Sequence, residues 1–339
     1  MDVPTIRLSD PSTAVPSECS GDRCRRFNRQ LDSSICSSAS GYGSSSEYDR
    51  CRACGWWHNH AAYYGTIRLQ DAVNDRGVWF IGSDKILKER PADDGLCTQG
   101  AISQALALDP AIPAPRVLHD WRDAKKQYFV LEERVPGTTL GQVWPTLIQS
   151  EKTDIAKQVA EVRQRLRALT APSIQSAGGG ACYPPFPCYV GCRADGPWHS
   201  DAELQETLRA RLTEDTPCGL PDKIVDNLLA RMPTCGPYVL THGDLHLTNI
   251  MVQEGKLTGI IDWEYAAYYP VWLEYVLVSS QSNCPDDAEW KALLREELDA
   301  HGDGYPDAVR FWDDVSALKG YPYLDGLGQR LLEKLSVGE

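Results

Sequence analysis

A polar run between short apolar stretches constrains this chain most. The run is His242-Gly243-Asp244-Leu245-His246-Leu247-Thr248-Asn249. The apolar residues 238–240 lead into it, residues 250–252 leave it, and residues 257–261 return after a turn and end at Asp262. Apolar runs of this length, separated by turn residues, are typical of β-strands. The pattern therefore predicts a β-hairpin with polar side chains at the ends of its strands.

Asp244, Asn249 and Asp262 have the spacing that phosphoryl transfer requires. Asp244 and Asn249 are separated like the Asp and Asn of the catalytic-loop pattern H-R-D-x-x-x-x-N, and Asp262 falls where a metal-binding Asp follows. We expect Asp244 to orient the acceptor and take its proton, and Asn249 and Asp262 to give Mg²⁺ its oxygen ligands. The less specific alternative is that Asp244 caps a turn and Asp262 merely ends a strand. His246 is expected to be a hydrogen-bonded structural residue.

These residues resemble the aminoglycoside phosphotransferase and choline kinase-like family, especially its fungal-type members. Three further segments are similar to that family and follow in its order: Ile112–Val117, Val130–Leu140 and Gly196–Ser200. The resemblance covers residues 75 to 280. It implies an α+β protein of the protein-kinase-like two-lobed fold, with a small N-terminal β-rich lobe and a larger, mainly helical C-terminal lobe.

The chain length suits two lobes, because 339 residues exceed what most single cores hold. We expect a cysteine- and serine-rich extension at residues 1–62, a nucleotide-binding lobe at 63–133, and a catalytic and acceptor-binding lobe at 134–339. Apolar residues at helical spacing predict a helix over residues 151–170 and two or three helices after Asp286.

The resemblance implies that ATP binds through Lys88, Gln99 and Glu133. Lys88 ends the second of two short strands that a turn at residues 82–84 connects, and would contact the phosphates. Main-chain groups near Glu133 would meet the adenine. Family members usually place a Glu in the first helix to pair with the lysine, but here Gln99 or Ala101 falls there. Gln99 is therefore expected to hold Lys88 through a neutral, weaker hydrogen bond.

Four residues after Asp262 are predicted to bind the acceptor: Glu264, Tyr268, Trp272 and Glu274. In the related kinases this region helps to form the acceptor pocket. Aromatic rings and carboxylates can hold an ammonium group by charge and cation–π contact. The alternative is that the rings fill the core of the large lobe.

The charge balance excludes some partners. A net charge of -13 argues against nucleic acid, whose phosphates reward clustered Lys and Arg, and suits a neutral or cationic small-molecule acceptor. No apolar run approaches the ~18 residues of a membrane-spanning helix, and no secretory signal opens the chain, so we expect a cytoplasmic protein. The sequence does not predict an oligomeric state.

The twelve cysteines are expected to be reduced thiols. Cys51 and Cys54 with His58 and His60 offer zinc ligands, but their spacing is cramped and free thiols are the alternative. Residues 171–197 lack periodicity, and their place in the family suggests a flap over the acceptor site. That segment contains Cys182, Cys188 and Cys192 at irregular spacing, which indicates ordinary thiols.

The sequence thus favours an ATP- and Mg²⁺-dependent small-molecule phosphotransferase. Two alternatives stay open. One is a pseudokinase that keeps the nucleotide site for binding or regulation. The other is an enzyme that uses Asp244 for acid–base chemistry without ATP, because fold alone does not fix function.

Overall fold

A computed structural model describes residues 19–20, 23–24, 67–73, 76–92, 98–183, 186, 194–214, 219–280, 282 and 284–337. The chain divides into two compact units. The first contains the chain up to Ala92 together with Arg116–Arg134, and the second contains Asp93–Pro115 and Val135–Glu339. The described part of the first unit is rich in strands and the second is mainly helical, which confirms the predicted mixed class.

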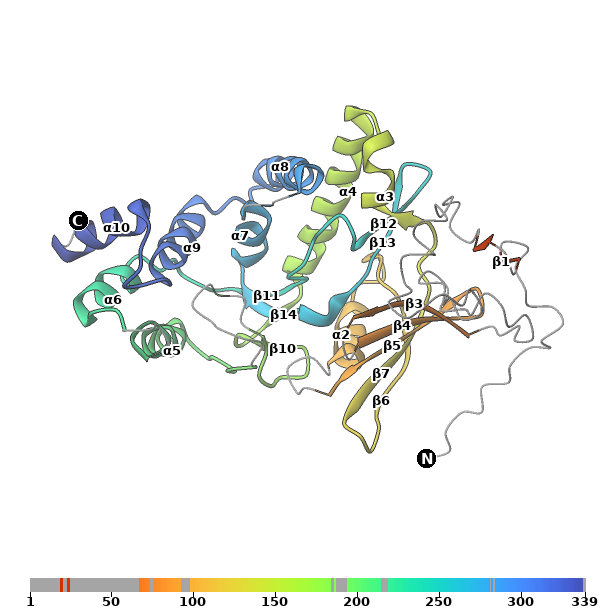
Figure 1. Cartoon of the computed structure of the whole chain (residues 1–339), viewed down its shortest axis with the longest axis horizontal. Helices are drawn as coiled ribbons and strands as arrows, with labels where there is room; N and C mark the ends of the chain where they lie inside the picture. The colour runs from red at the N-terminus through yellow and green to blue at the C-terminus, as the bar shows by residue number, and fades with distance from the viewer. Residues whose placement is uncertain are drawn as a thin grey trace, which may run out of the picture. The chain divides into compact units, whose positions relative to one another are not determined.

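The first unit holds a five-stranded antiparallel sheet in the order β3-β4-β5-β7-β6 (Figure 1). The strands are β3 (Ile67–Val73), β4 (Arg76–Ile81), β5 (Lys85–Pro91), β6 (Val117–Arg122) and β7 (Gln127–Glu133). The predicted turn at residues 82–84 joins β4 to β5. There Gly82 adopts a φ of +65°, which glycine tolerates without a Cβ clash.

One face of this sheet is buried. Phe80 of β4 and Tyr128 and Val130 of β7 lie on it, with exposed fractions of 6%, 2% and 2%. Val130 is the cross-strand partner of Lys88, so Lys88 projects from the same face. Lys88 lies in the middle of β5 rather than at its end, because the strand continues to Pro91.

The second unit contains two small sheets. One has the order β13-β12-β8 and the other the order β10-β14-β11-β9. The strands are β8 (Thr138–Thr139), β9 (Thr170–Ala171), β10 (Gln175–Ser176), β11 (Tyr238–Thr241), β12 (Ile250–Gln253), β13 (Lys256–Ile260) and β14 (Ala267–Pro270). The predicted hairpin is confirmed in β12 and β13, whereas β11 pairs with β9 and β14. The polar run 242–249 therefore connects the two sheets.

Helices are the main kind of secondary structure in the described part of the second unit. They are α2 (Gln99–Leu106), α3 (Leu140–Val143), α4 (Gln149–Ala168), α5 (Asp201–Glu214), α6 (Asp222–Leu229), α7 (Leu273–Ser279), α8 (Pro285–Ala300), α9 (Pro306–Leu318) and α10 (Gly326–Val337), with the 3₁₀ turns η2 (Trp144–Thr146) and η3 (Trp263–Tyr265). The helix predicted over residues 151–170 is confirmed as α4, whose Ile155, Val159 and Leu166 are buried. The C-terminal helices are confirmed as α8, α9 and α10.

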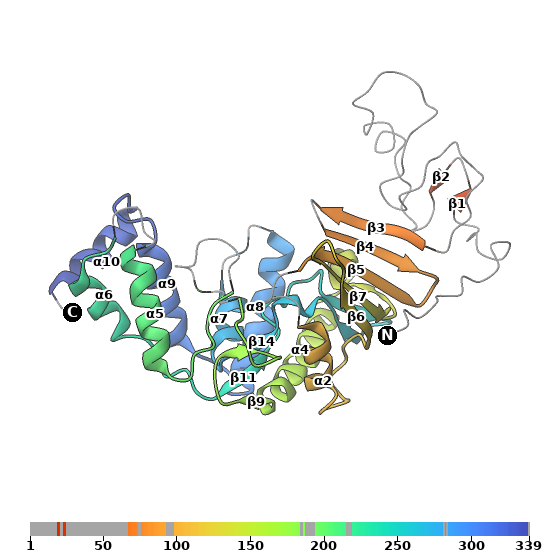
Figure 2. The ribbon, with the colours of Figure 1, turned by 90° about the horizontal axis from the view of Figure 1, so that it is seen from below.

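Two apolar cores support these elements. One joins α2, α4 and α8 to the strands around the polar run, with Leu240, Ile250 and Ile260 fully or almost fully buried. The other joins α5, α6, α9 and α10, which Figure 2 shows grouped towards the C-terminus. The strands on either side of the polar run are thus anchored in an apolar core. Among the described residues, no helix is both long and apolar enough to cross a membrane.

The predicted cysteine sites fall mostly outside the described residues. Near the N-terminus only the short ribbon of β1 (Cys19–Ser20) and β2 (Arg23–Cys24) is described. The candidate zinc ligands Cys51, Cys54, His58 and His60 lie outside the described residues, as do Cys188 and Cys192. Cys182 is a free, buried cysteine, and burial raises the pKa of its thiol to about 12. It is an unreactive thiol at neutral pH.

Candidate active site

Asp244 and Asn249 meet at the centre of the polar run. Asn249 Nδ2 donates to Asp244 Oδ2 over 2.8 Å and to the Asp244 carbonyl over 3.0 Å. Both hydrogen bonds come from the amide nitrogen of Asn249. The amide oxygen, Oδ1, takes no part in them and can accept a hydrogen bond or bind a cation. The run therefore presents a fixed carboxylate beside an amide oxygen.

Ile261 ties the end of β13 to this run. Its N–H donates to the Asn249 carbonyl over 2.9 Å, and its carbonyl lies 3.0 Å from His242 Nε2. His242 Nδ1 accepts from the Asp244 N–H over 3.2 Å, so Nε2 carries the ring hydrogen and donates to Ile261. The fully buried His242 ring thereby connects the segments that carry Asp244 and Asp262.

Asp262 has an unusual backbone. Its φ and ψ are 67° and 59°, in the left-handed region that residues other than glycine rarely adopt. Such conformations concentrate at functional sites, where the surrounding structure holds them in place. Here the hydrogen bonds of Ile261 hold the backbone before Asp262. The Trp263 indole, which donates to the Ile260 carbonyl over 2.7 Å, holds it on the other side.

Glu274 anchors the start of the polar run, which corrects its predicted role in acceptor binding. Its carboxylate is fully buried and accepts from the N–H of His242 over 2.8 Å and of Gly243 over 3.2 Å. Gly243 has a φ of +84°, so a side chain there would be strained. Burial raises the pKa of Glu274, although the charge of Arg163 and the two N–H donors oppose this.

Trp272 is the second correction among the predicted acceptor residues. Only 1% of it is exposed, and its indole donates to the Thr234 carbonyl over 3.2 Å. The ring fills the core because β14 and α7 pack against the C-terminal helices. Tyr268 is also buried, with 9% exposed, and Glu264 is half-buried. An acceptor role for those two stays a prediction.

Helix α8 contacts the run from another side. The Trp290 indole donates to the Leu245 carbonyl over 2.8 Å. Asp287 Oδ1 lies 3.0 Å from His246 Nδ1, and His246 Nε2 lies 3.3 Å from Asp244 Oδ1. His246 is hydrogen-bonded, as expected, but neither the Asp287 partner nor Trp290 carries a sequence signal, because both lie some forty residues further along.

The pKa of Asp244 is raised by burial. The charge of His246 and the hydrogen bond from Asn249 lower it, whereas the charges of Asp262 and Glu264 raise it again. Three carboxylates therefore influence one another here.

In the first unit, Lys88 has a carboxylate partner that the sequence did not predict. Its Nζ lies 3.1 Å from Oε1 of Glu132, a residue of β7 that is 4% exposed. The family resemblance suggests a partner for Lys88 only in the first helix, whereas this carboxylate belongs to a neighbouring strand. Gln99 is buried in the first turn of α2, a helix of the second unit. Its predicted bond to Lys88 stays a prediction.

Glu133 follows at the end of β7. Its side chain is paired with Arg116, and its N–H donates to the Arg116 carbonyl over 3.0 Å. The carboxylate is half-exposed, which fits the expectation that only main-chain groups of this segment meet adenine. That adenine contact stays a prediction.

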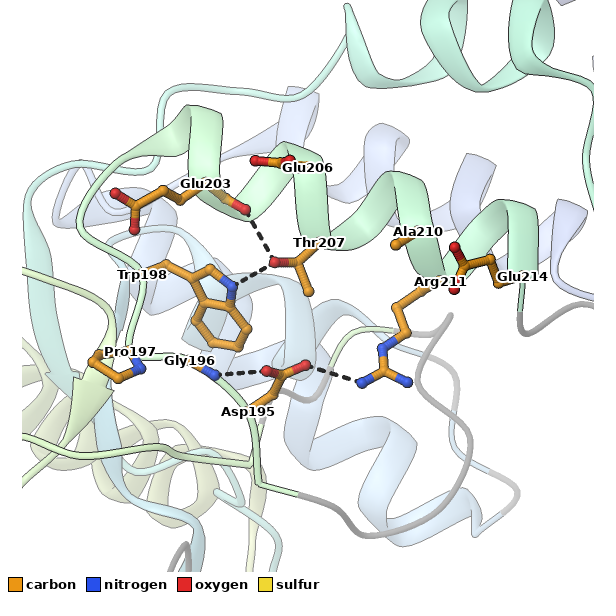
Figure 3. A pocket seen from close by; sticks show the side chains of 10 residues that line it. All are labelled: Asp195, Gly196, Pro197, Trp198, Glu203, Glu206, Thr207, Ala210, Arg211 and Glu214. Atoms are coloured by element: carbon orange, nitrogen blue, oxygen red, sulfur yellow. Dashed lines mark hydrogen bonds and ion pairs between the residues drawn. The ribbon is translucent and has the colours of Figure 1, made fainter.

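A pocket of about 600 Å³ lies beside α5 (Figure 3). Figure 3 shows Asp195 pointing towards Arg211, which it meets at 3.0 Å, and the Trp198 indole donating to Thr207. Acidic side chains predominate in the lining: Asp195, Glu203, Glu206 and Glu214 against Arg211. The pocket is therefore suited to a positively charged group.

The segment that lines part of this pocket also contacts Tyr265. Cys182 and Asp195 pair as a β-bridge, and the neighbouring Tyr183 ring meets Tyr265 edge-on at 6.4 Å between centroids. The Tyr265 carbonyl would lie 3.4 Å from a Cβ on Gly243. The segment expected to act as a flap therefore contacts Tyr265, whose carbonyl lies beside Gly243.

Asn249 and Asp262 are the two residues expected to give Mg²⁺ its oxygen ligands. Among the described residues, no three His, Cys, Asp or Glu side chains gather as metal ligands. Mg²⁺ does not need such a cage, because it binds through one or two protein oxygens together with substrate phosphates and water. An amide oxygen and a carboxylate beside Asp244 fit that requirement.

Comparison with known proteins gives consistent results. The model of the family described as "Phosphotransferase enzyme family" (APH) matches residues 72–312. No curated protein is similar enough to the chain to count as a relative.

Solved structures share the fold. A thermostable mutant of aminoglycoside phosphotransferase APH(4)-Ia, solved with AMP-PNP and hygromycin B, matches with 15% identity and a TM-score of 0.55 over 82% of this chain and 96% of that one. The streptomycin–ATP complex of APH(2")-IIa matches with 12% identity and a TM-score of 0.50 over 80% of this chain and 90% of that one. The predicted kinase-like fold, with its β-rich N-terminal and helical C-terminal parts, is confirmed.

Proposed function

Because the chain belongs to the phosphotransferase enzyme family, we propose that it transfers the γ-phosphoryl group of ATP to a hydroxyl group of a small molecule. The observation that carries the proposal is the bond from Asn249 Nδ2 to Asp244 Oδ2, together with the ties through Ile261 that hold Asp262 next to it. A base, an amide oxygen and a second carboxylate are the groups that this reaction uses.

Asp244 orients the acceptor. The acceptor hydroxyl donates to its carboxylate, which takes the proton as the new oxygen–phosphorus bond forms and the bond from the γ-phosphorus to ADP breaks. Asn249 keeps the carboxylate in place. No other residue of the polar run has a carboxylate, which makes Asp244 the base in this proposal.

Asn249 would bind Mg²⁺ through its amide oxygen, Oδ1, and Asp262 would bind it through its carboxylate. When bound, Mg²⁺ neutralises charge on the phosphates. Lys88, held by Glu132, adds a further positive charge for the phosphates. Main-chain groups near Glu133 would bind adenine, and Gln99 would support Lys88.

The acceptor in this proposal is a small molecule with a positive charge. The acidic lining of the α5 pocket and the net charge of -13 support this choice. Both structural neighbours named above were solved with an aminoglycoside, so hygromycin B and streptomycin are suitable first compounds to test. Glu264 and Tyr268 would contribute to acceptor binding.

Mg²⁺-dependent release of ADP in the presence of hydroxyl compounds tests the proposal. Cationic and neutral acceptors should be compared, with an Asp244→Asn variant as the control for contaminating kinases. A rise of the melting temperature with Mg-ATP but no turnover with any acceptor would favour a pseudokinase. No response to ATP in either assay would favour chemistry without ATP.

A further inference from the structure

His246 is held between two carboxylates. Its Nε2 lies 3.3 Å from Asp244 Oδ1, and its Nδ1 lies 3.0 Å from Asp287 Oδ1. The contact of Nδ1 with Asp287 is a hydrogen bond, and the contact of Nε2 with Asp244 is a close approach of the ring to the carboxylate. The ring thus bridges the proposed base and helix α8.

The far end of this bridge is buried. Asp287 lies in the first turn of α8 and is 7% exposed, and Lys291 Nζ lies 3.5 Å from its other oxygen, Oδ2. Lys291 is itself 8% exposed and sits one helical turn further on. A buried carboxylate with a charged neighbour keeps a fixed position, which makes Asp287 a firm anchor for the ring.

At the other end of the bridge, His246 and Asp244 are more exposed than Asp287. The side chain of His246 is 43% exposed and that of Asp244 is 31% exposed. Packing alone therefore does not set the orientation of the His246 ring. The hydrogen bond to Asp287 sets it, and the Trp290 indole fixes the intervening backbone at Leu245.

Each oxygen of the Asp244 carboxylate consequently has its own neighbour. Asn249 Nδ2 donates to Oδ2 over 2.8 Å, and His246 Nε2 faces Oδ1. We propose that His246 is a positioning residue that fixes the plane of the Asp244 carboxylate, with Asp287 and Lys291 holding its ring. This inference rests on the proposed phosphotransferase function.

The expected effect is on turnover. A displacement of about 1 Å at the reacting groups can cost roughly a hundredfold in rate. Loss of one of the two orienting contacts leaves Asp244 in the site but lets its carboxylate rotate. The rate constant kcat should therefore fall while KM for ATP, which depends on other residues, stays the same.

Two substitutions at His246 separate its two contacts. In His246→Gln the amide nitrogen reaches the position of Nε2 and can still donate to Asp244, whereas in His246→Asn it reaches the position of Nδ1 and can donate only to Asp287. We expect kcat to fall at least tenfold in His246→Asn and about threefold in His246→Gln. Equal losses in both variants, or a lower melting temperature with kcat unchanged, would overturn the proposal.

Helix α8 offers a matched pair for the anchor. Asp286 and Asp287 are neighbours in its first turn, but only Asp287 lies against His246. Asp287→Ala should reduce kcat about tenfold and Asp286→Ala should not. Because Asp287 acts through the His246 ring, the double variant Asp287→Ala/His246→Asn should be no slower than His246→Asn alone. Additive losses would contradict the bridge.

Measurements of unfolding test the contacts of His246 with Asp244 and Asp287 independently of turnover. In denaturant titrations of the full chain, the effects of Asp244→Asn and His246→Asn on the unfolding equilibrium constant should be coupled by at least twofold. The effects of Asp287→Ala and His246→Gln should be coupled by at least fivefold, because His246→Gln loses the contact with Asp287. Absence of coupling in either pair overturns the proposal. Coupling in a protein that releases no ADP would instead refute the proposed function and leave the bridge established.

Discussion

Lys88 and Glu132 form an ion pair across two neighbouring strands, with 3.1 Å between Nζ and Oε1. The register pairs Lys88 with Val130, so Glu132 is its diagonal neighbour on the buried face of the sheet. Glu132 is almost fully buried, and a buried carboxylate is costly without a charged partner. The sheet itself therefore supplies the charge that the first helix lacks.

We expect Glu132→Gln to lower kcat/KM for ATP about tenfold or more. A hydrogen bond to a charged group contributes about 1.5–3 kcal/mol, and Lys88 would lose its orientation with that bond. Glu133→Gln is the matched control, because the neighbouring carboxylate is half-exposed and pairs with Arg116 instead. ADP release at varied ATP concentration measures both. An equal effect of the two substitutions would contradict the role of Glu132.

Asp244→Asn should abolish phosphoryl transfer and leave nucleotide binding nearly intact. The amide keeps the shape of the carboxylate but does not take the acceptor proton. Calorimetric titration with Mg-ATP should give a dissociation constant within about threefold of the wild-type value, since binding depends on other groups. Turnover at the wild-type rate would rule out Asp244 as the base.

Asp244, Asn249 and Asp262 can be identified from the sequence as candidates because these residues are close along the chain. Asp244 and Asn249 are five positions apart, and a turn brings Asp262 back, so local spacing sufficed. Glu132 was missed because the contact depends on the register of β5 against β7, which no local pattern encodes. Asp287 and Trp290 were missed for a similar reason, since α8 meets the run through tertiary packing.

The acceptor prediction failed at Glu274 and Trp272 for a different physical reason. Carboxylates and aromatic rings close to Asp262 suggested a cation pocket. Nothing in the sequence shows that the N–H groups of His242 and Gly243 need a buried acceptor, which Glu274 provides. The Trp272 ring is drawn into the core, where large aromatic surfaces are stabilised by burial.

Asp262→Ala should weaken Mg²⁺-dependent ATP binding more than Asn249→Ala does. A carboxylate brings a formal charge to the cation, whereas an amide oxygen brings only a dipole. Titration of each variant with ATP, in the presence of Mg²⁺ and of a chelator, separates the metal-dependent part of binding. If Asp262→Ala binds Mg-ATP as tightly as the wild-type protein, Asp262 is not a metal ligand.

Glu274→Gln should destabilise the protein and slow turnover. The carboxylate accepts from two backbone N–H groups, and the amide has one oxygen to offer, so one N–H loses its partner. An unsatisfied buried donor costs about 1–3 kcal/mol of unfolding free energy. Glu296→Gln on α8 is the control, because that residue is exposed. The destabilisation should be visible in denaturant titrations at neutral pH.

The loss of stability in Glu274→Gln should depend on pH. Burial raises the pKa of Glu274 in the folded protein, so the unfolded chain has already lost this proton at pH values where the folded protein keeps it. The contribution of the group to stability is fully present below the unfolded pKa of about 4.3 and is lost as the pH rises through the folded value. The stability difference between the wild-type protein and Glu274→Gln should therefore be larger at pH 5 than at pH 8. A difference that grows towards pH 8 would mean that the anchoring bonds outweigh burial and lower the pKa of Glu274.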